Sequence, residues 1–128
     1  MNIEFNGKVY FTEEELKCKG SGKLILAPGF AEALLAIRIA WGRPLHPTSV
    51  CRSREYNRKI GSTDGSWHVC DDNRGGARAI DIRMINAEDR KAFVELALAM
   101  GWSVGINKTF VHIDRRVDAG EKQLMFTY

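Results

Sequence analysis

The sequence contains no apolar run of the roughly 18 to 20 residues that a membrane-spanning helix needs, so stable membrane insertion is not expected. Its first residues, Met1-Asn2-Ile3-Glu4, lack the basic and then apolar order of a secretory signal peptide. Internal repeats, low-complexity tracts and linkers are also missing. These absences predict a protein made in the cytoplasm, which would need another route to act outside the cell.

Excess charge and paired cysteines are lacking too. The formal net charge is only +3, and the basic residues are scattered rather than gathered on one predicted helix face, so no nucleic-acid partner is expected. The three cysteines are odd in number and have no Cys-x-x-Cys spacing, so they do not make a disulfide framework. We expect a monomer with reduced cysteines.

What is present is an ordinary globular composition. The chain has 128 residues, of which 45% are hydrophobic and 27% charged. A chain of this size can bury one hydrophobic core without disulfides or metals to hold it together. We therefore expect a single domain over residues 1–128.

Helices are predicted in four places. Over residues 28–41, apolar residues recur at intervals of four, three and four, and Gly42 follows as a stop signal. A second long helix is predicted after Asn86, which is a good N-cap residue. Short helices are predicted after Thr12, which begins a capping-box pattern, and after Ser53.

Strands are predicted mostly in the second half of the chain, where short apolar runs are separated by turn residues. A weak alternation in residues 1–11 suggests an additional edge strand. The pattern predicts an α+β fold with a small, largely antiparallel sheet and helices packed around it. The other candidate strands are residues 45–50, 81–85, 102–106, 110–114 and 123–128.

His112 and Asp114 share one face of the predicted strand 110–114, because side chains alternate between faces along an extended chain. Val111 and Ile113 then point into the core. The two polar side chains are expected side by side in a surface cleft. The alternative is a histidine and an aspartate without function on a half-buried strand.

Asp81 lies in the apolar stretch Ala79-Ile80-Asp81-Ile82, where a carboxylate is costly to bury unless it is paired or bound to a metal. An ion pair with Arg78 or Arg83 would satisfy it without a metal. Ser66-Trp67-His68 adds a second histidine at the end of a polar loop. Three protein ligands of this kind, with a fourth position left to water, make a catalytic zinc site. The predicted Zn²⁺ ligands are His68, Asp81 and His112.

Six segments follow one another as in a known family: Ser49-Val50-Cys51-Arg52-Ser53, Glu55-Tyr56-Asn57, Ser66-Trp67-His68, Ala77-Arg78-Ala79-Ile80-Asp81-Ile82, Val104-Gly105-Ile106 and Phe110-Val111-His112-Ile113-Asp114. Over residues 11–116 the chain resembles the zinc D-alanyl-D-alanine carboxypeptidases and L-alanyl-D-glutamate endopeptidases, which include many phage endolysins. The resemblance implies a zinc peptidase that hydrolyses peptidoglycan stem or crosslink peptides by metal-activated water.

The spacing of the first two ligands departs from this family. His68 and Asp81 are 81 − 68 = 13 residues apart, more than is usual, so residues 69–76 form an extra loop. Loop closure becomes costlier only slowly with length, so the insertion is compatible with a metal site. Asp71 and Asp72 are alternative ligands within the loop. Asp81 is preferred because it keeps the family's Ala-x-Asp-Ile context.

The resemblance also suggests roles for residues around the metal. Thr109 stands where many relatives have the acidic general base, so we predict Asp114 as the base, with support of a metal ligand as its alternative role. Arg52 matches an arginine that faces substrate, where it suits a carboxylate or an oxyanion. A surface arginine is the alternative. Ser66 is predicted either to bind substrate or only to end the loop.

Cys51 and Cys70 flank motif residues, which allows a disulfide between them or a zinc site that includes Cys70. Free, buried cysteines are the simpler prediction.

The leading function is a zinc metallopeptidase with a peptidoglycan peptide as its partner. A non-catalytic phage structural or wall-binding module with the same fold is the alternative, and a metal-free scaffold with a salt-bridged Asp81 is a third. Without a signal peptide, the protein would act at the cell wall after release from the cytoplasm or as part of a virion.

Overall fold

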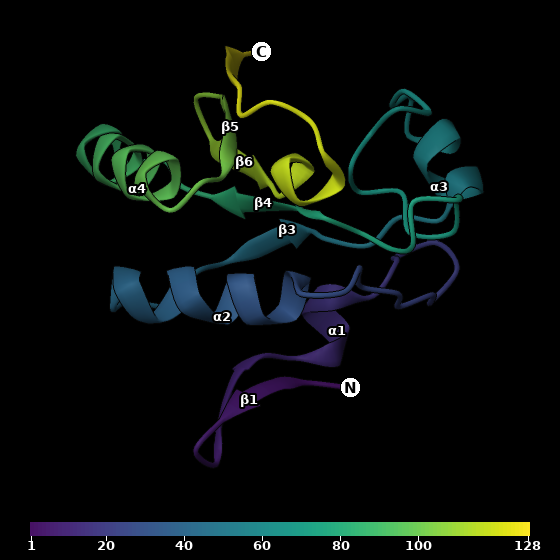
Figure 1. Ribbon diagram of the computed structural model, residues 1–128, viewed down its shortest axis with the longest axis horizontal. Helices are drawn as coiled ribbons and strands as arrows, with labels where there is room; N and C mark the ends of the chain where they lie inside the picture. Colours follow the sequence, from purple (N-terminus) through teal and green to yellow (C-terminus); the bar gives the residue numbers. More distant parts are fainter.

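The central sheet is built mainly from the second half of the chain in the computed structural model, which describes residues 1–128. Neighbouring strands are antiparallel except for the last pair, β5 and β7, which is parallel. The predicted α+β class with a largely antiparallel sheet is confirmed (Figure 1). In spatial order the strands are β3 (Pro47–Ser49), β4 (Ala79–Arg83), β6 (Phe110–Asp114), β5 (Ser103–Ile106) and β7 (Met125–Thr127).

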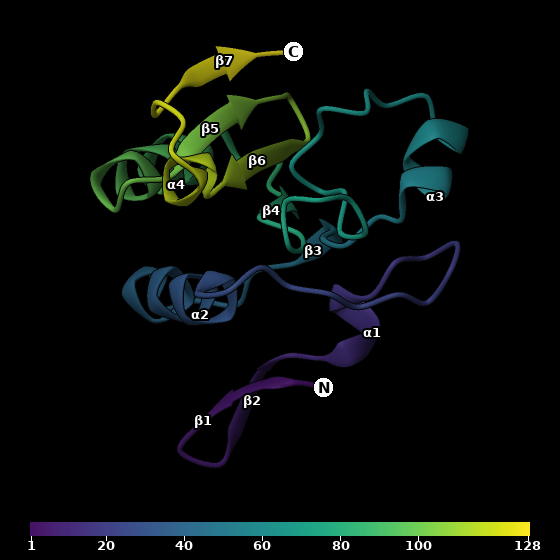
Figure 2. The same cartoon turned by 45° about the vertical axis from the view of Figure 1, so that its right-hand side comes forward.

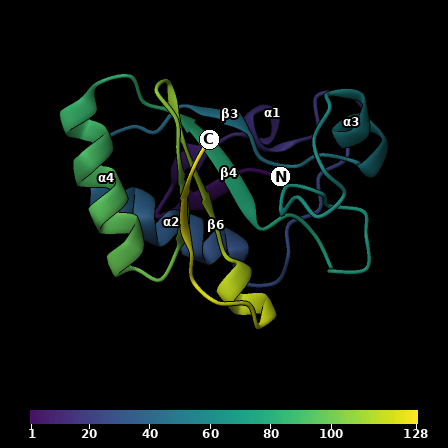
Figure 3. The ribbon, with the colours of Figure 1, turned by 90° about the horizontal axis from the view of Figure 1, so that it is seen from above.

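One face of this sheet packs against α2 (Phe30–Trp41) and α4 (Ala87–Ala99). Ile80, Ile82, Val111 and Ile113 are fully buried in a core shared with apolar side chains of both helices. Because side chains alternate along a strand, the polar residues between them point to the opposite face. Seen from above, α4 lies along one side of the strands and α3 (Arg54–Lys59) lies beyond the other (Figure 3).

The predicted cap and stop residues are confirmed, although α2 begins at Phe30 rather than at residue 28. The side chain of Asn86 accepts hydrogen bonds from the first turn of α4, and Gly42 ends α2 in a left-handed conformation with φ 74°. Thr12 forms the predicted capping box at the start of α1 (Glu13–Leu16), and the Ser53 side chain caps α3. None of the helices is long and apolar enough to cross a membrane.

The N-terminal residues differ from the prediction of an edge strand. They form the hairpin β1 (Ile3–Phe5) and β2 (Lys8–Phe11), a separate two-stranded sheet that lies apart from the central one (Figure 2). Asn6 and Gly7 connect the strands with φ values of 51° and 78°. Two consecutive left-handed residues are what a tight hairpin turn requires, and Asn-Gly adopts them readily.

Four strands of the central sheet also have bounds that differ from the predicted ones. β5 and β7 are shorter than the predicted 102–106 and 123–128. β4 begins at Ala79 and ends at Arg83, rather than covering residues 81–85, because its pairing with β6 runs from Ala79 opposite Asp114 to Arg83 opposite Phe110. The predicted strand 45–50 shrinks to β3. A 3₁₀ helix, η1 (Arg116–Ala119), replaces part of the turn expected after β6.

Candidate metal centre

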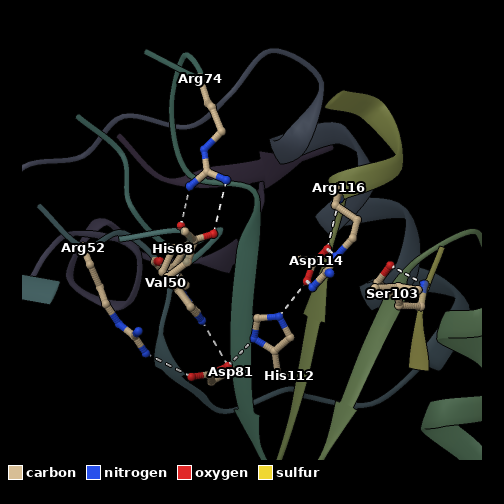
Figure 4. Close-up of polar contacts among 12 residues, drawn as sticks. Val50, Arg52, His68, Arg74, Asp81, Ser103, His112, Asp114 and Arg116 are labelled. Carbon is tan, nitrogen blue, oxygen red and sulfur yellow. Dashed lines mark hydrogen bonds and ion pairs between the residues drawn. The ribbon is translucent and has the colours of Figure 1, made fainter. Parts of the chain in front are cut away.

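The three predicted ligands meet on the face of the sheet opposite the core. Asp81 of β4 and His112 of β6 are direct partners in the antiparallel register. His68 arrives from the loop after α3, which a bridge between Arg52 and Val69 ties to the segment after β3. All three side chains are buried, and one donor atom from each lies within 4.8 Å of the others. Figure 4 shows the two imidazoles converging on Asp81.

The contacts of His68 leave one ring nitrogen for a cation. Its Nδ1 lies 2.8 Å from the carbonyl oxygen of Val50, which can only accept, so Nδ1 carries the proton. Burial lowers the pKa of His68 and is stronger than the opposing effect of Asp81, so the ring is neutral. Its Nε2 lone pair therefore faces Asp81 Oδ1 at 3.1 Å. Two acceptors at this distance are stabilised by a positive ion between them.

His112 lies between two carboxylates. Its Nδ1 is 2.9 Å from Asp81 Oδ1, and its Nε2 is 2.7 Å from Asp114 Oδ2. Burial alone would lower the pKa of His112, but the hydrogen bonds to Asp114 and Asp81 outweigh it, and the pKa is raised. With a metal at Nδ1, the Nε2 proton would still be donated to Asp114. Two imidazoles and a carboxylate are a donor set that fits zinc.

Asp114 contacts His112 but does not line a cleft that is open to solvent. It is fully buried, and its oxygens accept hydrogen bonds from the Arg116 guanidinium and from His112. The expectation that Asp114 stands in a surface cleft is therefore wrong, since a residue two positions further on folds back over it. Its role as general base stays a prediction. The contacts favour the alternative role, the support of a metal ligand.

Arg52 donates from each of its three guanidinium nitrogens to a neighbouring side chain. Its Nε donates to Ser49 Oγ at 3.0 Å, one terminal nitrogen donates to Asn57 Oδ1, and the other pairs with Asp81 Oδ2 at 3.2 Å. The Arg52 side chain is only 12% exposed, so it is not the surface arginine of the alternative. Asp81 is salt-bridged to Arg52, and not to Arg78 or Arg83. Because this ion pair uses Asp81 Oδ2, Asp81 Oδ1 faces the two histidines.

The inserted loop, residues 69–76, lies outside the centre. Asp71 accepts hydrogen bonds from Lys23 and from the backbone N–H of Arg54, and Asp72 pairs with Arg74. Both carboxylates that competed with Asp81 are therefore engaged elsewhere. The loop neither covers the metal ligands nor displaces them.

A hollow of about 300 Å³ opens above the three ligands, and we call it the metal-site cleft. Residues 60–62 and Ser66 line one side, and Phe110 and Tyr128 line the other. Asp81 is its only carboxylate, and no residue of the loop 69–76 lines it. A larger hollow, of about 670 Å³ around Trp67, holds no converging set of metal donors.

Of Ser66 and Thr109, only Ser66 lines this cleft. Ser66 lines the cleft, and its Oγ accepts a hydrogen bond from the backbone N–H of His68, so it also shapes the turn before the ligand. Thr109 lies outside the cleft, in the β5–β6 turn, with its hydroxyl bonded to Asn107.

Two residues of the site are not among those predicted from the sequence. Asn57 braces Arg52 and donates to the carbonyl of Thr63, and Tyr128 forms part of the cleft wall. Asn57 lay within a recognised motif segment and could have been assigned. Tyr128 could not, because only the pairing of β7 with β5 brings it to the site.

The three cysteines are free and buried, as predicted. Neither Cys51 nor Cys70 belongs to the metal-donor group.

A buried His-Asp-His centre on the open face of a small α+β sheet defines a candidate metallopeptidase. The family comparison agrees: residues 9–114 match Peptidase M15, so the chain belongs to this family of D-Ala-D-Ala carboxypeptidase-like zinc peptidases. Membership implies a metallopeptidase with a peptide substrate. Searches of curated proteins and of solved structures give no significant match.

Proposed function

We propose that the protein is a zinc-dependent peptidase that hydrolyses stem or crosslink peptides of peptidoglycan, as a D-Ala-D-Ala carboxypeptidase or an endopeptidase. One observation supports it above all. His68 Nε2 and Asp81 Oδ1 face each other at 3.1 Å in a buried group with His112, within a family whose members are zinc peptidases. Peptidoglycan as the substrate rests on the sequence resemblance alone.

The residues around the centre have distinct tasks in this proposal. His68, Asp81 and His112 hold the metal, while Arg52 fixes the second oxygen of Asp81. Asp114 accepts a hydrogen bond from Nε2–H of His112 and so orients its ring. A zinc ion in this position acts as a Lewis acid toward a peptide carbonyl and increases the acidity of water.

The experiment is hydrolysis of purified peptidoglycan, measured as the release of new amino groups. The proposal expects hydrolysis that a chelator abolishes and that added zinc restores. His68→Ala should be inactive, whereas His46→Ala should match the wild type, because His46 is exposed and lies outside the donor group. Hydrolysis that persists after full metal removal would refute a metallopeptidase.

The alternative, a non-catalytic phage structural or wall-binding module, is favoured by one observation. The metal-site cleft contains no carboxylate except the ligand Asp81, so no free acidic base faces the substrate space. In this case the wild type would sediment with peptidoglycan and release no amino groups.

We also propose that the protein works as a monomer at the cell wall, after release from the cytoplasm or as part of a virion. Its positive net charge of +3 suits an anionic wall. Fractionation of producing cells and of purified virions would distinguish the two routes.

A further inference from the structure

Part of the wall of the metal-site cleft comes from Tyr128, the residue that follows β7, and both lie beyond the residues matched to the family. The register places Asp81, His112, Gly105 and Phe126 in one row across four neighbouring strands. The Phe126 ring lies 5.8 Å from the His112 ring. Figure 2 shows β7 running alongside β5 at the edge of the sheet.

Gly105 lets the aromatic residues come this close. A Cβ at position 105 would lie 2.5 Å from Phe126 Cε2 and 3.1 Å from Tyr128 Cε2. Both rings therefore rest on the bare backbone of β5, next to the strand that carries His112. Any larger residue at position 105 would push them away from the centre.

Tyr128 extends this wall into the cleft. Its ring packs edge-on against Phe110, with centroids 5.1 Å apart, and against Phe126 at 5.7 Å. Its backbone N–H donates to the carbonyl of Ile106, which fixes the residue at the end of β7. Partial desolvation, and next the negative charge of Asp81, raise the pKa of Tyr128, although 66% of the residue stays exposed to solvent. The phenol therefore keeps its proton at neutral pH.

The Tyr128 hydroxyl makes no hydrogen bond within the protein, in contrast to the other strong donor of the cleft. Arg52 already directs three of its five N–H groups at Ser49, Asn57 and Asp81, which hold its guanidinium in place. A peptide bound over the metal ligands would need a donor for the carbonyl oxygen that becomes negative during hydrolysis. Tyr128 is a donor in the cleft that is free to provide it.

We propose that Tyr128 is a catalytic residue, whose hydroxyl donates a hydrogen bond to the carbonyl oxygen of the scissile peptide bond. This inference rests on the proposed function. It gives Tyr128, which lies outside the matched segment, a substrate contact of the kind that the family resemblance implies for Arg52. Phe126 and Gly105 act as positioning residues, because they set where the Tyr128 ring lies.

The test compares Tyr128→Phe with the wild type on a soluble peptidoglycan peptide. The variant keeps the ring and loses only the hydroxyl. We expect kcat to fall about 10- to 100-fold, which is at or below the effect of removing one oxyanion donor, while KM changes little. Affinity for a phosphinic peptide, which mimics the tetrahedral state, should fall by the same factor as kcat/KM. Bound zinc and the melting temperature should stay the same.

Tyr10→Phe is the matched control, since Tyr10 lies on β2 and does not line the cleft. Tyr128→Phe with wild-type kcat, or an equal loss in Tyr10→Phe, would overturn the inference. So would a loss of phosphinic peptide affinity in Ser62→Ala but not in Tyr128→Phe, because Ser62 also lines the cleft. An inactive wild type overturns the function and the inference together. Activity that survives Tyr128→Phe overturns only the inference.

Discussion

Both oxygens of the Asp114 carboxylate accept hydrogen bonds from neighbouring residues of the protein. Arg116 lies on one side of it and His112 on the other, and the side chain has no exposed surface. A base that takes a proton from water in the cleft must be able to reach that water. At the scale of the residue, Asp114 is therefore placed to hold an imidazole.

Asp114→Asn should weaken zinc binding. The amide can still meet His112, but it loses the charge that favours a proton on Nε2 and a free lone pair on Nδ1. Loss of such an outer partner typically lowers metal affinity about 10- to 100-fold. Competition with a coloured chelator would measure the change.

Asp64→Asn is the control for this prediction, because Asp64 also pairs with an arginine but is exposed on the surface. Unchanged zinc affinity in Asp114→Asn, together with lost turnover, would instead identify Asp114 as the base.

Asp114 should also make the metal-free protein sensitive to acid. Burial would raise its pKa, but the hydrogen bonds from Arg116 and His112 outweigh burial and lower the pKa to about 2. A carboxyl with a lowered folded-state pKa stabilises the fold above its unfolded value of about 3.9, and this contribution is lost as the pH falls. We expect a loss of about 2 kcal/mol in the free energy of unfolding between about pH 4 and pH 2.

Urea unfolding of chelator-treated protein across this range would measure the effect. Asp114→Asn should be less stable near neutral pH and should have a flatter pH dependence. Parallel curves for the two proteins would show that other carboxyl groups cause the acid sensitivity.

The metal ligands could be predicted from the sequence, whereas their neighbours could not. An aspartate between Ile80 and Ile82 must have a partner, and alternation along a strand fixes the face of His112. Nothing in the sequence shows that Arg116 folds back over Asp114, because that contact depends on the 3₁₀ turn of η1. The engagement of Arg52 likewise depends on how β3 lies against β4.

At the scale of the elements, the row across β4, β6, β5 and β7 connects the metal ligands to the cleft wall. Gly105 is the member most sensitive to substitution, because the rings of Phe126 and Tyr128 occupy the space that a side chain there would need. Helix positions followed from caps and spacing along the chain. The register of the strands did not, because pairing between β5 and β7 depends on contacts between residues far apart in sequence.

Gly105→Ala should destabilise the protein by about 1 to 3 kcal/mol, since the added methyl would overlap the Phe126 ring. Thermal unfolding followed by near-ultraviolet circular dichroism would report both the stability and the aromatic packing. Gly65→Ala is the matched control, because a Cβ there meets nothing within 4 Å. It should change the stability by less than about 0.5 kcal/mol. Equal effects of the two substitutions would contradict the close packing of β7.

At the scale of the whole molecule, core and site lie on opposite faces of one sheet. Ile80 and Ile82 pack toward α2 and α4, while Asp81 between them points to the metal ligands. The core therefore needs no metal to form, and α2 and α4 remain packed when the site is empty. Metal should add stability to a chain that is already folded.

Zinc should raise the melting temperature of chelator-treated protein. A ligand at 100 times its dissociation constant stabilises the folded state by about 2.7 kcal/mol. For a chain of this length, this corresponds to a rise of roughly 5 to 20 °C. Differential scanning calorimetry at several zinc concentrations would measure it. His68→Ala should lose the response and His46→Ala should keep it, and an equal response of both would place the bound zinc elsewhere.

The bridge between Arg52 and Val69 links the segment after β3 to the first residue of the loop 69–76. His68 adds a further attachment of this region, through its contact with Asp81 on β4. In a chain whose three thiols are free, a metal at this point would do the work of a covalent crosslink. Limited proteolysis would then distinguish the metal-free protein from the metal-bound protein. In the metal-free protein, cleavage should begin in the exposed residues 61–65 while the sheet stays intact.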